Sequence, residues 1–239
     1  MTPAVLLLHG FTHTGASWQP VVAALGERYR AIAPDIRGHG SASDAEPVTL
    51  QAVISDLGAL GPERFALVGY SMGGRLALHA ALAMPQRVDR LVLVGASPGI
   101  ADATERMQRR RSDERLAAEI ERSGIEEFAH RWATTAVLAD QPSAVQEAAH
   151  RDRLRNSSSG LAAALRGLGT GALPSLWDRL GELSMPVTLV VGERDEKFRA
   201  IDARMAERIA DCQVVIVPGA GHAVHLEVPG TVASILVRG

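Results

Sequence analysis

A serine flanked by glycines, placed directly after a short apolar run, limits this chain to few folds. Residues 69–74 read GYSMGG, the preceding residues 65–68 are apolar, and residues 75–84 have a helical pattern that stops at Pro85. A strand, a tight turn and a helix in this order form a nucleophile elbow, which presents a serine hydroxyl above a sheet at a helix N-terminus. The pattern therefore predicts Ser71 as a catalytic nucleophile.

Short apolar runs alternate with amphipathic segments over much of the chain. This alternation is typical of a mainly parallel sheet with helices on both faces. The runs predict strands at residues 5–8, 31–34, 65–68, 90–94, 187–191 and 213–217, each buried on both faces. Residues 49–60 are expected to form a helix capped by Thr49. Together with the elbow, these elements predict an α/β fold of the α/β-hydrolase type.

The alternation breaks between residues 98 and 185, where the chain becomes helical and charged. Arginines gather there at positions 106, 109, 110, 111 and 115, and residues 156–160 (NSSSG) interrupt the pattern. We therefore expect a hydrolase core formed by residues 1–97 and 186–239, with residues 98–185 inserted as a helical lid. Such an insertion belongs above the strand ends, where substrates bind.

An acid and a histidine follow the serine in the order that this fold uses. Asp195 comes just after the run 187–191, and His222 just after the run 213–217. His222 is therefore predicted as the base that takes the proton of Ser71, with Asp195 fixing its tautomer. His225 is the strongest rival for the base and Glu193 an alternative acid.

Three further expectations concern the surroundings of this triad. The backbone amides of Phe11 and Met72 are predicted to form an oxyanion hole, because one donor follows the nucleophile and one comes from an early loop. His9 and His39, in glycine-rich loops, are expected to shape the pocket. Asp202 is expected on a solvated helix face.

Composition excludes several classes of protein. The 239 residues are 46% hydrophobic, which suits one sizeable core, and the net charge of −2 gives no reason to expect a nucleic-acid or membrane partner. No apolar run approaches the about 20 residues of a membrane span, and the start lacks the features of a signal peptide. One cysteine allows no internal disulfide. We expect a cytoplasmic protein, as a monomer or small homo-oligomer, with a small-molecule substrate.

Several segments together narrow the family. They are residues 67–75 (LVGYSMGGR), 98–99 (PG), 109–113 (RRRSD), 154–156 (LRN) and 192–198 (GERDEKF). Through them the chain resembles, over nearly its full length, the 2-succinyl-6-hydroxy-2,4-cyclohexadiene-1-carboxylate synthases of menaquinone biosynthesis. The resemblance implies a lyase on a hydrolase scaffold. It would remove pyruvate from 2-succinyl-5-enolpyruvyl-6-hydroxy-3-cyclohexene-1-carboxylate by a 2,5-elimination, without a metal or organic cofactor.

The resemblance also implies roles for individual residues. Ser71, with His222 and Asp195, would supply the base that takes a carbon-bound proton. The substrate-binding residues that it implies are Tyr70, Arg75, Arg109, Trp132 and Arg155. The arginines suit a substrate with three carboxylates, because a guanidinium binds a carboxylate through two parallel hydrogen bonds. Because Arg110 and Arg111 follow Arg109 directly, the sequence leaves open which of these three arginines contacts the substrate.

Two other functions remain open from the sequence. A carboxylester or carbon–carbon bond hydrolase would use the same triad, with Ser71 forming an acyl-enzyme. A non-catalytic ligand receptor on the same fold is a further alternative, since a fold does not fix a function.

Overall fold

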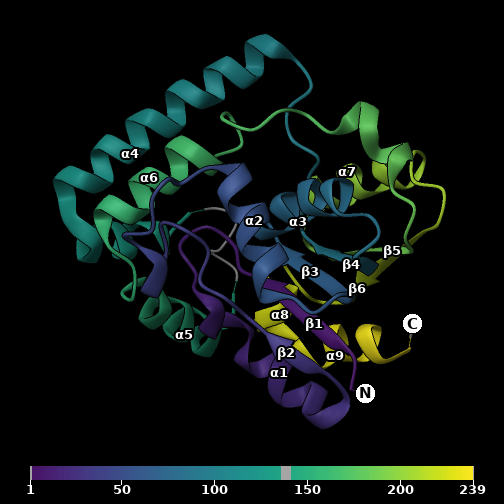
Figure 1. Ribbon diagram of the computed structural model, residues 1–239. Coiled ribbons are helices and arrows are strands. Elements are labelled where there is room, and N and C mark those ends of the chain that lie inside the picture. The colour runs from purple at the N-terminus through teal and green to yellow at the C-terminus, as the bar shows by residue number, and fades with distance from the viewer. Residues whose placement is uncertain (1, 136–140, 239) are drawn as a thin grey trace.

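The computed structural model describes residues 2–135 and 141–238. Its centre is a parallel six-stranded sheet in the order β2-β1-β3-β4-β5-β6 (Figure 1). The strands are β1 (Ala4–Leu8), β2 (Arg30–Ile32), β3 (Phe65–Tyr70), β4 (Val88–Val94), β5 (Val187–Gly192) and β6 (Cys212–Val217). The predicted fold class is confirmed, and each predicted strand is found to within a few residues.

Alternating side chains of the strands pack into two cores, one on each face of the sheet. Leu6 and Leu8 face the core made with α2 (Leu50–Leu60), α3 (Met72–Ala83) and α7 (Glu196–Ala206). Val5 and Leu7 face the core made with α1 (Gln19–Leu25), α8 (Val224–Glu227) and α9 (Pro229–Arg238). This double covering explains why the central strands read as unbroken apolar runs.

The two edge strands depart from that expectation. Val214 and Ile216 of β6 are exposed, and β2 is at most half-buried. An edge strand pairs on one side only, so the apolar run of β6 does not imply burial on both faces here. The prediction of complete burial was wrong for these two strands.

Helix boundaries follow local chemistry. The hydroxyl of Thr49 accepts a hydrogen bond from the amide of Ala52 at 3.3 Å, so Thr49 caps α2 as predicted. Short 3-10 turns lie at Gly15–Trp18 (η1), Gly26–Arg28 (η2), Gly40–Ala42 (η3) and Trp177–Glu182 (η4).

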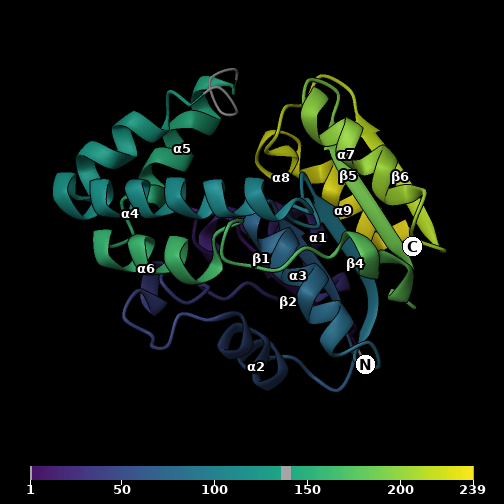
Figure 2. The ribbon, with the colours of Figure 1, turned by 90° about the horizontal axis from the view of Figure 1, so that it is seen from above.

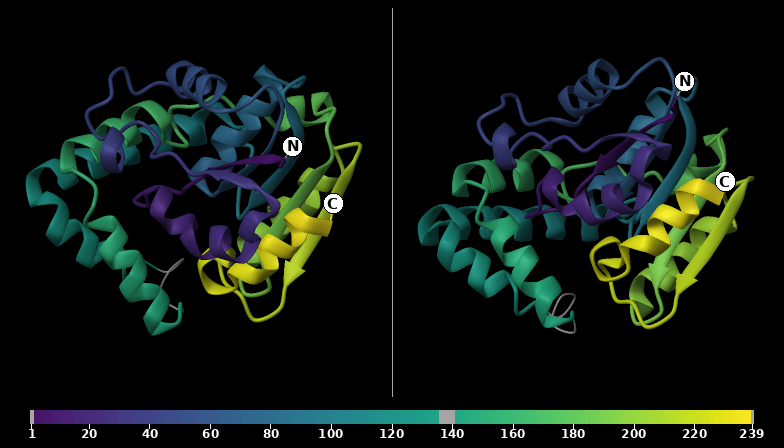
Figure 3. Two further views of the ribbon diagram at one scale, coloured as in Figure 1. Left: turned by 60° about the horizontal axis from the view of Figure 1, so that its bottom comes forward. Right: turned by 90° about the horizontal axis from the view of Figure 1, so that it is seen from below.

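The lid segment, residues 98–185, contains α4 (Ala103–Trp132), α5 (Ser143–Arg153) and α6 (Ser158–Leu168). Helix α4 is interrupted at Gly124, whose φ of 82° is non-helical, and it runs beside α6 (Figure 2). A small core joins the two helices through Ala117, Ile120, Phe128, Leu161 and Leu165. Two further views show these helices gathered on one side of the molecule (Figure 3).

Two other observations bear on the sequence-based expectations. Asp202 is only 1% exposed on α7, so the expectation of a solvated helix face was wrong. No helix within residues 2–135 and 141–238 is long and apolar enough to cross a membrane.

Candidate active site

Ser71 lies between β3 and α3 in a strained backbone conformation. Its φ of 50° and ψ of −109° are unusual for a residue other than glycine. The turn closes because its glycines carry no side chain. A Cβ on Gly69 would come within 2.4 Å of the carbonyl oxygen of Gly73, and a Cβ on Gly73 within 2.3 Å of that of Leu8. This is the geometry that a nucleophile elbow requires.

The structure brings Ser71, His222 and Asp195 together. The Nε2 atom of His222 is 3.3 Å from Ser71 Oγ, and its Nδ1 atom is 2.6 Å from Asp195 Oδ2. Asp195 follows β5 and accepts a hydrogen bond from the amide of Phe198 at its other oxygen. The ring of His222 is largely buried between Tyr70 and Phe198, whose ring centroids are 5.2 and 4.6 Å away.

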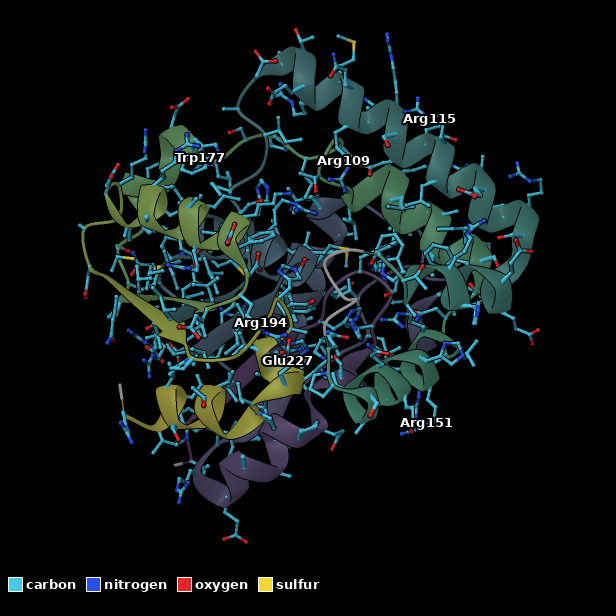
Figure 4. The ribbon with its side chains drawn as sticks, turned by 180° about the vertical axis from the view of Figure 1, so that it is seen from behind. Arg109, Arg115, Arg151, Trp177, Arg194 and Glu227 are labelled. Carbon is cyan, nitrogen blue, oxygen red and sulfur yellow. The ribbon has the colours of Figure 1, made fainter. Side chains whose placement is uncertain are left out.

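The loop that carries His222 is fixed by backbone contacts. The amide of Gly221 donates to Glu227 Oε2 at 2.9 Å, and the same carboxylate pairs with Arg194 at 2.9 Å (Figure 4). On its other side, a Cβ on Gly95 would come within 2.9 Å of the His222 ring. The position of His222 is therefore set by neighbouring main chain as well as by Asp195.

The rival histidines have other surroundings. His225 is fully buried, and burial lowers its pKa well below the ordinary value. His9 receives a hydrogen bond from the amide of Ile36, and burial lowers its pKa to about 4. His39 packs edge-on against Phe11, and burial lowers its pKa to about 3. These rings are neutral at neutral pH, and the histidine that contacts Ser71 Oγ is His222.

A cavity of about 400 Å³ opens above Ser71. Phe11 and Met72 both line it. Met72 is the first residue of α3, so its amide has no acceptor within that helix. Of the two predicted oxyanion donors, Met72 thus lies at a helix N-terminus that favours negative charge, and Phe11 comes from the loop after β1.

Comparison with known proteins agrees with this geometry. The alpha/beta hydrolase family matches residues 5–235. The chain belongs to the alpha/beta hydrolase family. It is 39% identical, over 95% of its length and 86% of the relative, to a putative 2-succinyl-6-hydroxy-2,4-cyclohexadiene-1-carboxylate synthase of Bacillus subtilis (strain 168).

Two further relatives point the same way. A synthase of the same name from Salmonella newport (strain SL254) is 34% identical over 99% of this chain and 93% of its own. The structure of MenH from S. aureus superimposes with a TM-score of 0.92 at 29% identity, covering 99% of this chain and 92% of that one. The resemblance expected from the sequence motifs is confirmed.

Two of the predicted arginines line the cavity of this alpha/beta hydrolase family member. Arg75 is 7% exposed, and its Nη2 reaches the carbonyl oxygen of Leu168 at 3.5 Å. Burial, together with the nearby charge of Arg109, lowers the pKa of Arg75 to about 10, which leaves it charged at neutral pH. Its Nε atom has no partner within the described part of the chain.

Arg109 reaches the cavity from α4 (Figure 4). Its Nε donates to Asp113 Oδ1 at 2.7 Å, and its side chain is 45% exposed. Arg110 and Arg111 are exposed and do not line the cavity. Of these three consecutive arginines, Arg109 is the one that lines the cavity.

The predicted aromatic residues also line the cavity. Tyr70 is 3% exposed and contacts the ring of His222. Trp132 ends α4 and packs edge-on against Phe11, with ring centroids 5.5 Å apart. Core and lid thus meet at the cavity through a pair of aromatic rings.

Arg155, predicted as a substrate-binding residue, does not line the cavity. It lies in the turn after α5, with its side chain 66% exposed and its Nε 4.0 Å from Asp152 Oδ1. It lines a separate surface groove with Thr14 and Asp35. The backbone turn directs this side chain outward, whereas the preceding Arg153 is buried.

Sequence reasoning missed two cavity residues that can bind anions or hydroxyl groups. Lys197 lies in the first turn of α7, with its Nζ 5.5 Å from the centre of the Phe198 ring. Its position two residues after Asp195 is the sequence feature that could have predicted Lys197 as a cavity residue. His13 follows β1 and carried no signal, because its partner Asp152 is 139 residues away. Among the described residues, no group of three metal-ligating side chains is found.

Proposed function

We propose that this protein eliminates pyruvate from 2-succinyl-5-enolpyruvyl-6-hydroxy-3-cyclohexene-1-carboxylate to give 2-succinyl-6-hydroxy-2,4-cyclohexadiene-1-carboxylate. The observation that carries the proposal is the presence of Ser71, His222, Arg75 and Arg109 around one cavity. A polycarboxylate substrate explains why buried and half-buried cations line a site built for base chemistry. A cytoplasmic location in menaquinone biosynthesis is part of the proposal.

The triad supplies the base. His222 takes the proton of Ser71 Oγ as that oxygen removes a proton from a ring carbon of the substrate. Asp195 accepts the Nδ1 hydrogen of His222 and stabilises the imidazolium that forms. The electron pair released from the carbon–hydrogen bond forms a new double bond to the neighbouring ring carbon, and the existing ring double bond shifts by one position toward the carbon that bears the enolpyruvyl group. The carbon–oxygen bond to the enolpyruvyl group breaks, and the departing enolate becomes pyruvate on protonation.

The amides of Met72 and Phe11 stabilise the charge that spreads onto the succinyl carbonyl during proton removal. Amides fixed in the backbone, that of Met72 at the N-terminus of α3 and that of Phe11 in the loop after β1, need no reorganisation as charge develops. Tyr70 and Trp132 form the apolar walls. Neither a metal nor a cofactor takes part in these steps.

The carboxylates of the substrate need separate cationic partners. Arg75 and Arg109 approach from the core and from the lid, and Lys197 adds a third cation beside Asp195. We assign these three residues to carboxylate binding. Arg155, which the resemblance implied, is not part of the proposed site.

The test is direct. Purified protein is incubated with the pathway substrate while pyruvate is measured, beside a panel of simple aryl esters assayed in ¹⁸O-labelled water. We expect pyruvate release, no ¹⁸O in the cyclohexadiene product, no burst of leaving group from esters and poor ester turnover. Efficient ester turnover with no pyruvate release would establish the hydrolase alternative, which uses the same triad through an acyl-enzyme.

A further inference from the structure

A second histidine–aspartate pair lies at the same cavity. His13 Nδ1 is 3.2 Å from Oδ2 of Asp152, and both residues are buried, at 2% and 6% exposure. His13 belongs to the loop after β1, whereas Asp152 lies in the last turn of α5 in the lid segment. The pair therefore joins the core to the lid beside the proposed active site.

The carboxylate of Asp152 is well satisfied. The amide of Thr14 donates to Oδ2 at 2.9 Å, and the hydroxyl of Thr14 donates to Oδ1 at 2.5 Å. Burial on its own would raise the pKa of Asp152, but the hydrogen bonds from His13 and Thr14 outweigh burial and hold this pKa below its ordinary value. Asp152 is thus an ionised acceptor that fixes the orientation of the His13 ring.

The same end of α5 is anchored to the core a second time. Asn156 Nδ2 donates to the carbonyl oxygen of Thr12 at 2.9 Å, and its Oδ1 accepts a hydrogen bond from the amide of Gly40 at 3.0 Å. The segment 152–156 is therefore docked on the loop that carries His13. Because Asn156 also anchors this segment, Asp152 is not the sole contact between this end of α5 and the core. Its hydrogen bond to His13 can therefore serve a function other than anchoring.

The contact with Asp152 engages one ring nitrogen of His13 and leaves the other available. With Nδ1 donating to Asp152, the lone pair of a neutral ring is at Nε2. Within residues 2–135 and 141–238, the side-chain hydrogen bond of His13 is the one between Nδ1 and Asp152, and His13 lines the cavity together with Tyr70 and Ser71. The ring centroid of His13 is 6.1 Å from that of Tyr70, which also packs against His222 at 5.2 Å and His225 at 4.2 Å.

We propose that His13 is a substrate-binding residue whose Nε2 accepts a hydrogen bond from the ring hydroxyl of the substrate, with Asp152 as its positioning residue. This inference rests on the proposed function. Arg75, Arg109 and Lys197 bind carboxylates, whereas a neutral imidazole with a lone pair toward the ligand suits a hydroxyl donor. Because Asp152 comes from the lid, the hydroxyl contact forms only while α5 is docked.

The kinetic test uses His13→Phe, which keeps a ring but removes both nitrogens, and Asp152→Asn. His13→Phe is expected to lower kcat/KM for pyruvate release about tenfold, the cost of one hydrogen bond to the ligand. The double variant should lose no more than His13→Phe alone, because both changes remove one contact. His130→Phe, at an exposed histidine of α4, is the matched control and should leave kcat/KM unchanged.

A spectroscopic test separates binding from a purely structural role. In protein labelled with ¹⁵N-histidine, the Nε2 signal of His13 should shift when citrate, a hydroxylated tricarboxylate, is added. The signal should respond far less in Asp152→Asn. If the wild-type protein releases no pyruvate, the proposed function fails, and the citrate response still decides the role of His13. Wild-type kcat/KM in a folded His13→Phe variant, or an Nε2 signal unmoved by citrate, would overturn the proposal.

Discussion

The strand ends of the sheet and the lid segment contribute to one cavity in different ways. At the strand ends, each triad residue is held by backbone. Ser71 lies in a closed glycine turn, His222 lies against Gly95 and follows Gly221, whose amide donates to Glu227, and Asp195 accepts a hydrogen bond from the amide of Phe198. In the lid, Arg109 is held by one ion pair and is 45% exposed. The chemistry is thus built on the rigid part of the molecule, and recognition of the substrate is shared with a more open part.

This difference has a physical reason. Proton transfer requires hydrogen-bond distances between the reacting groups, so a small displacement costs much of the rate. Attraction between a guanidinium and a carboxylate falls off slowly with distance, and a long side chain can adjust. We therefore expect changes at the sheet to affect kcat and changes in the lid to affect mainly KM.

The largest effect is expected for Ser71→Ala. Loss of the oxygen removes the atom that transfers the proton, and kcat/KM should fall about 10³-fold or more. The free energy of unfolding should change little, because Ser71 is only partly buried and, among the described residues, its hydroxyl contacts His222 at 3.3 Å. Ser97→Ala, at another serine lining the cavity, serves as the control. Near-native turnover by Ser71→Ala would remove this residue from the mechanism.

The triad and the fold could be predicted from the sequence because both depend on short-range patterns. Residues 69–74 set the elbow locally, and Asp195 and His222 follow apolar runs directly. A mainly parallel sheet follows from these runs and from the rule that parallel strands need long crossovers, usually helices. The order of the strands within the sheet came from the structure.

The lid positions and buried polar residues could not be predicted in the same way. The exposure of Arg155 depends on the conformation of one turn after α5, and no periodic pattern in the sequence predicts that conformation. His13 depends on a contact with a residue far along the chain. Asp202 lies in helix α7, and a charged residue in a helix usually faces solvent. In this structure its side chain is buried instead.

The second prediction compares a core arginine with a lid arginine. Arg75→Gln should cost about 2–5 kcal/mol in kcat/KM, because a buried carboxylate loses its charged partner. Arg109→Gln should cost about 1 kcal/mol, because solvent screens a half-exposed pair. Steady-state kinetics of pyruvate release distinguishes them. Equal losses would mean that the lid site is as desolvated as the core site.

The free energy of unfolding should depend on pH through the buried carboxyl of Asp202. Burial, with the charge of Asp195, raises the pKa of Asp202 to about 8, against 3.8 for an ordinary aspartate. The folded state thus binds this proton more tightly than the unfolded state, and the contribution of Asp202 to stability declines as the pH rises from about 4 to 8. Above pH 8, Asp202 is ionised in the folded state, and the full cost of burying that charge lowers the free energy of unfolding.

Asp202→Asn removes that penalty. The variant should equal the wild type near pH 4 and exceed it by about 2 kcal/mol in the free energy of unfolding at pH 8. Urea titrations at a series of pH values measure this difference. Asp178→Asn, at an exposed carboxyl of the lid segment, should show no such trend. A constant difference between wild type and Asp202→Asn across this range would contradict a raised pKa.

The smallest effect is expected for Arg155→Gln, and it tests the comparison most sharply. The Arg155 side chain is 66% exposed and 4.0 Å from its nearest carboxylate oxygen, so a screened pair of this kind contributes little to stability. We expect kcat and KM within about twofold of the wild type and an unfolding free energy within about 0.5 kcal/mol. Arg109→Gln, measured in the same assay, supplies the contrast for a lid arginine that does reach the cavity. A tenfold rise in KM for Arg155→Gln would show that the turn after α5 rearranges when substrate binds. The lid would then be a moving part of the site, and its difference from the sheet would lie in motion as well as in exposure.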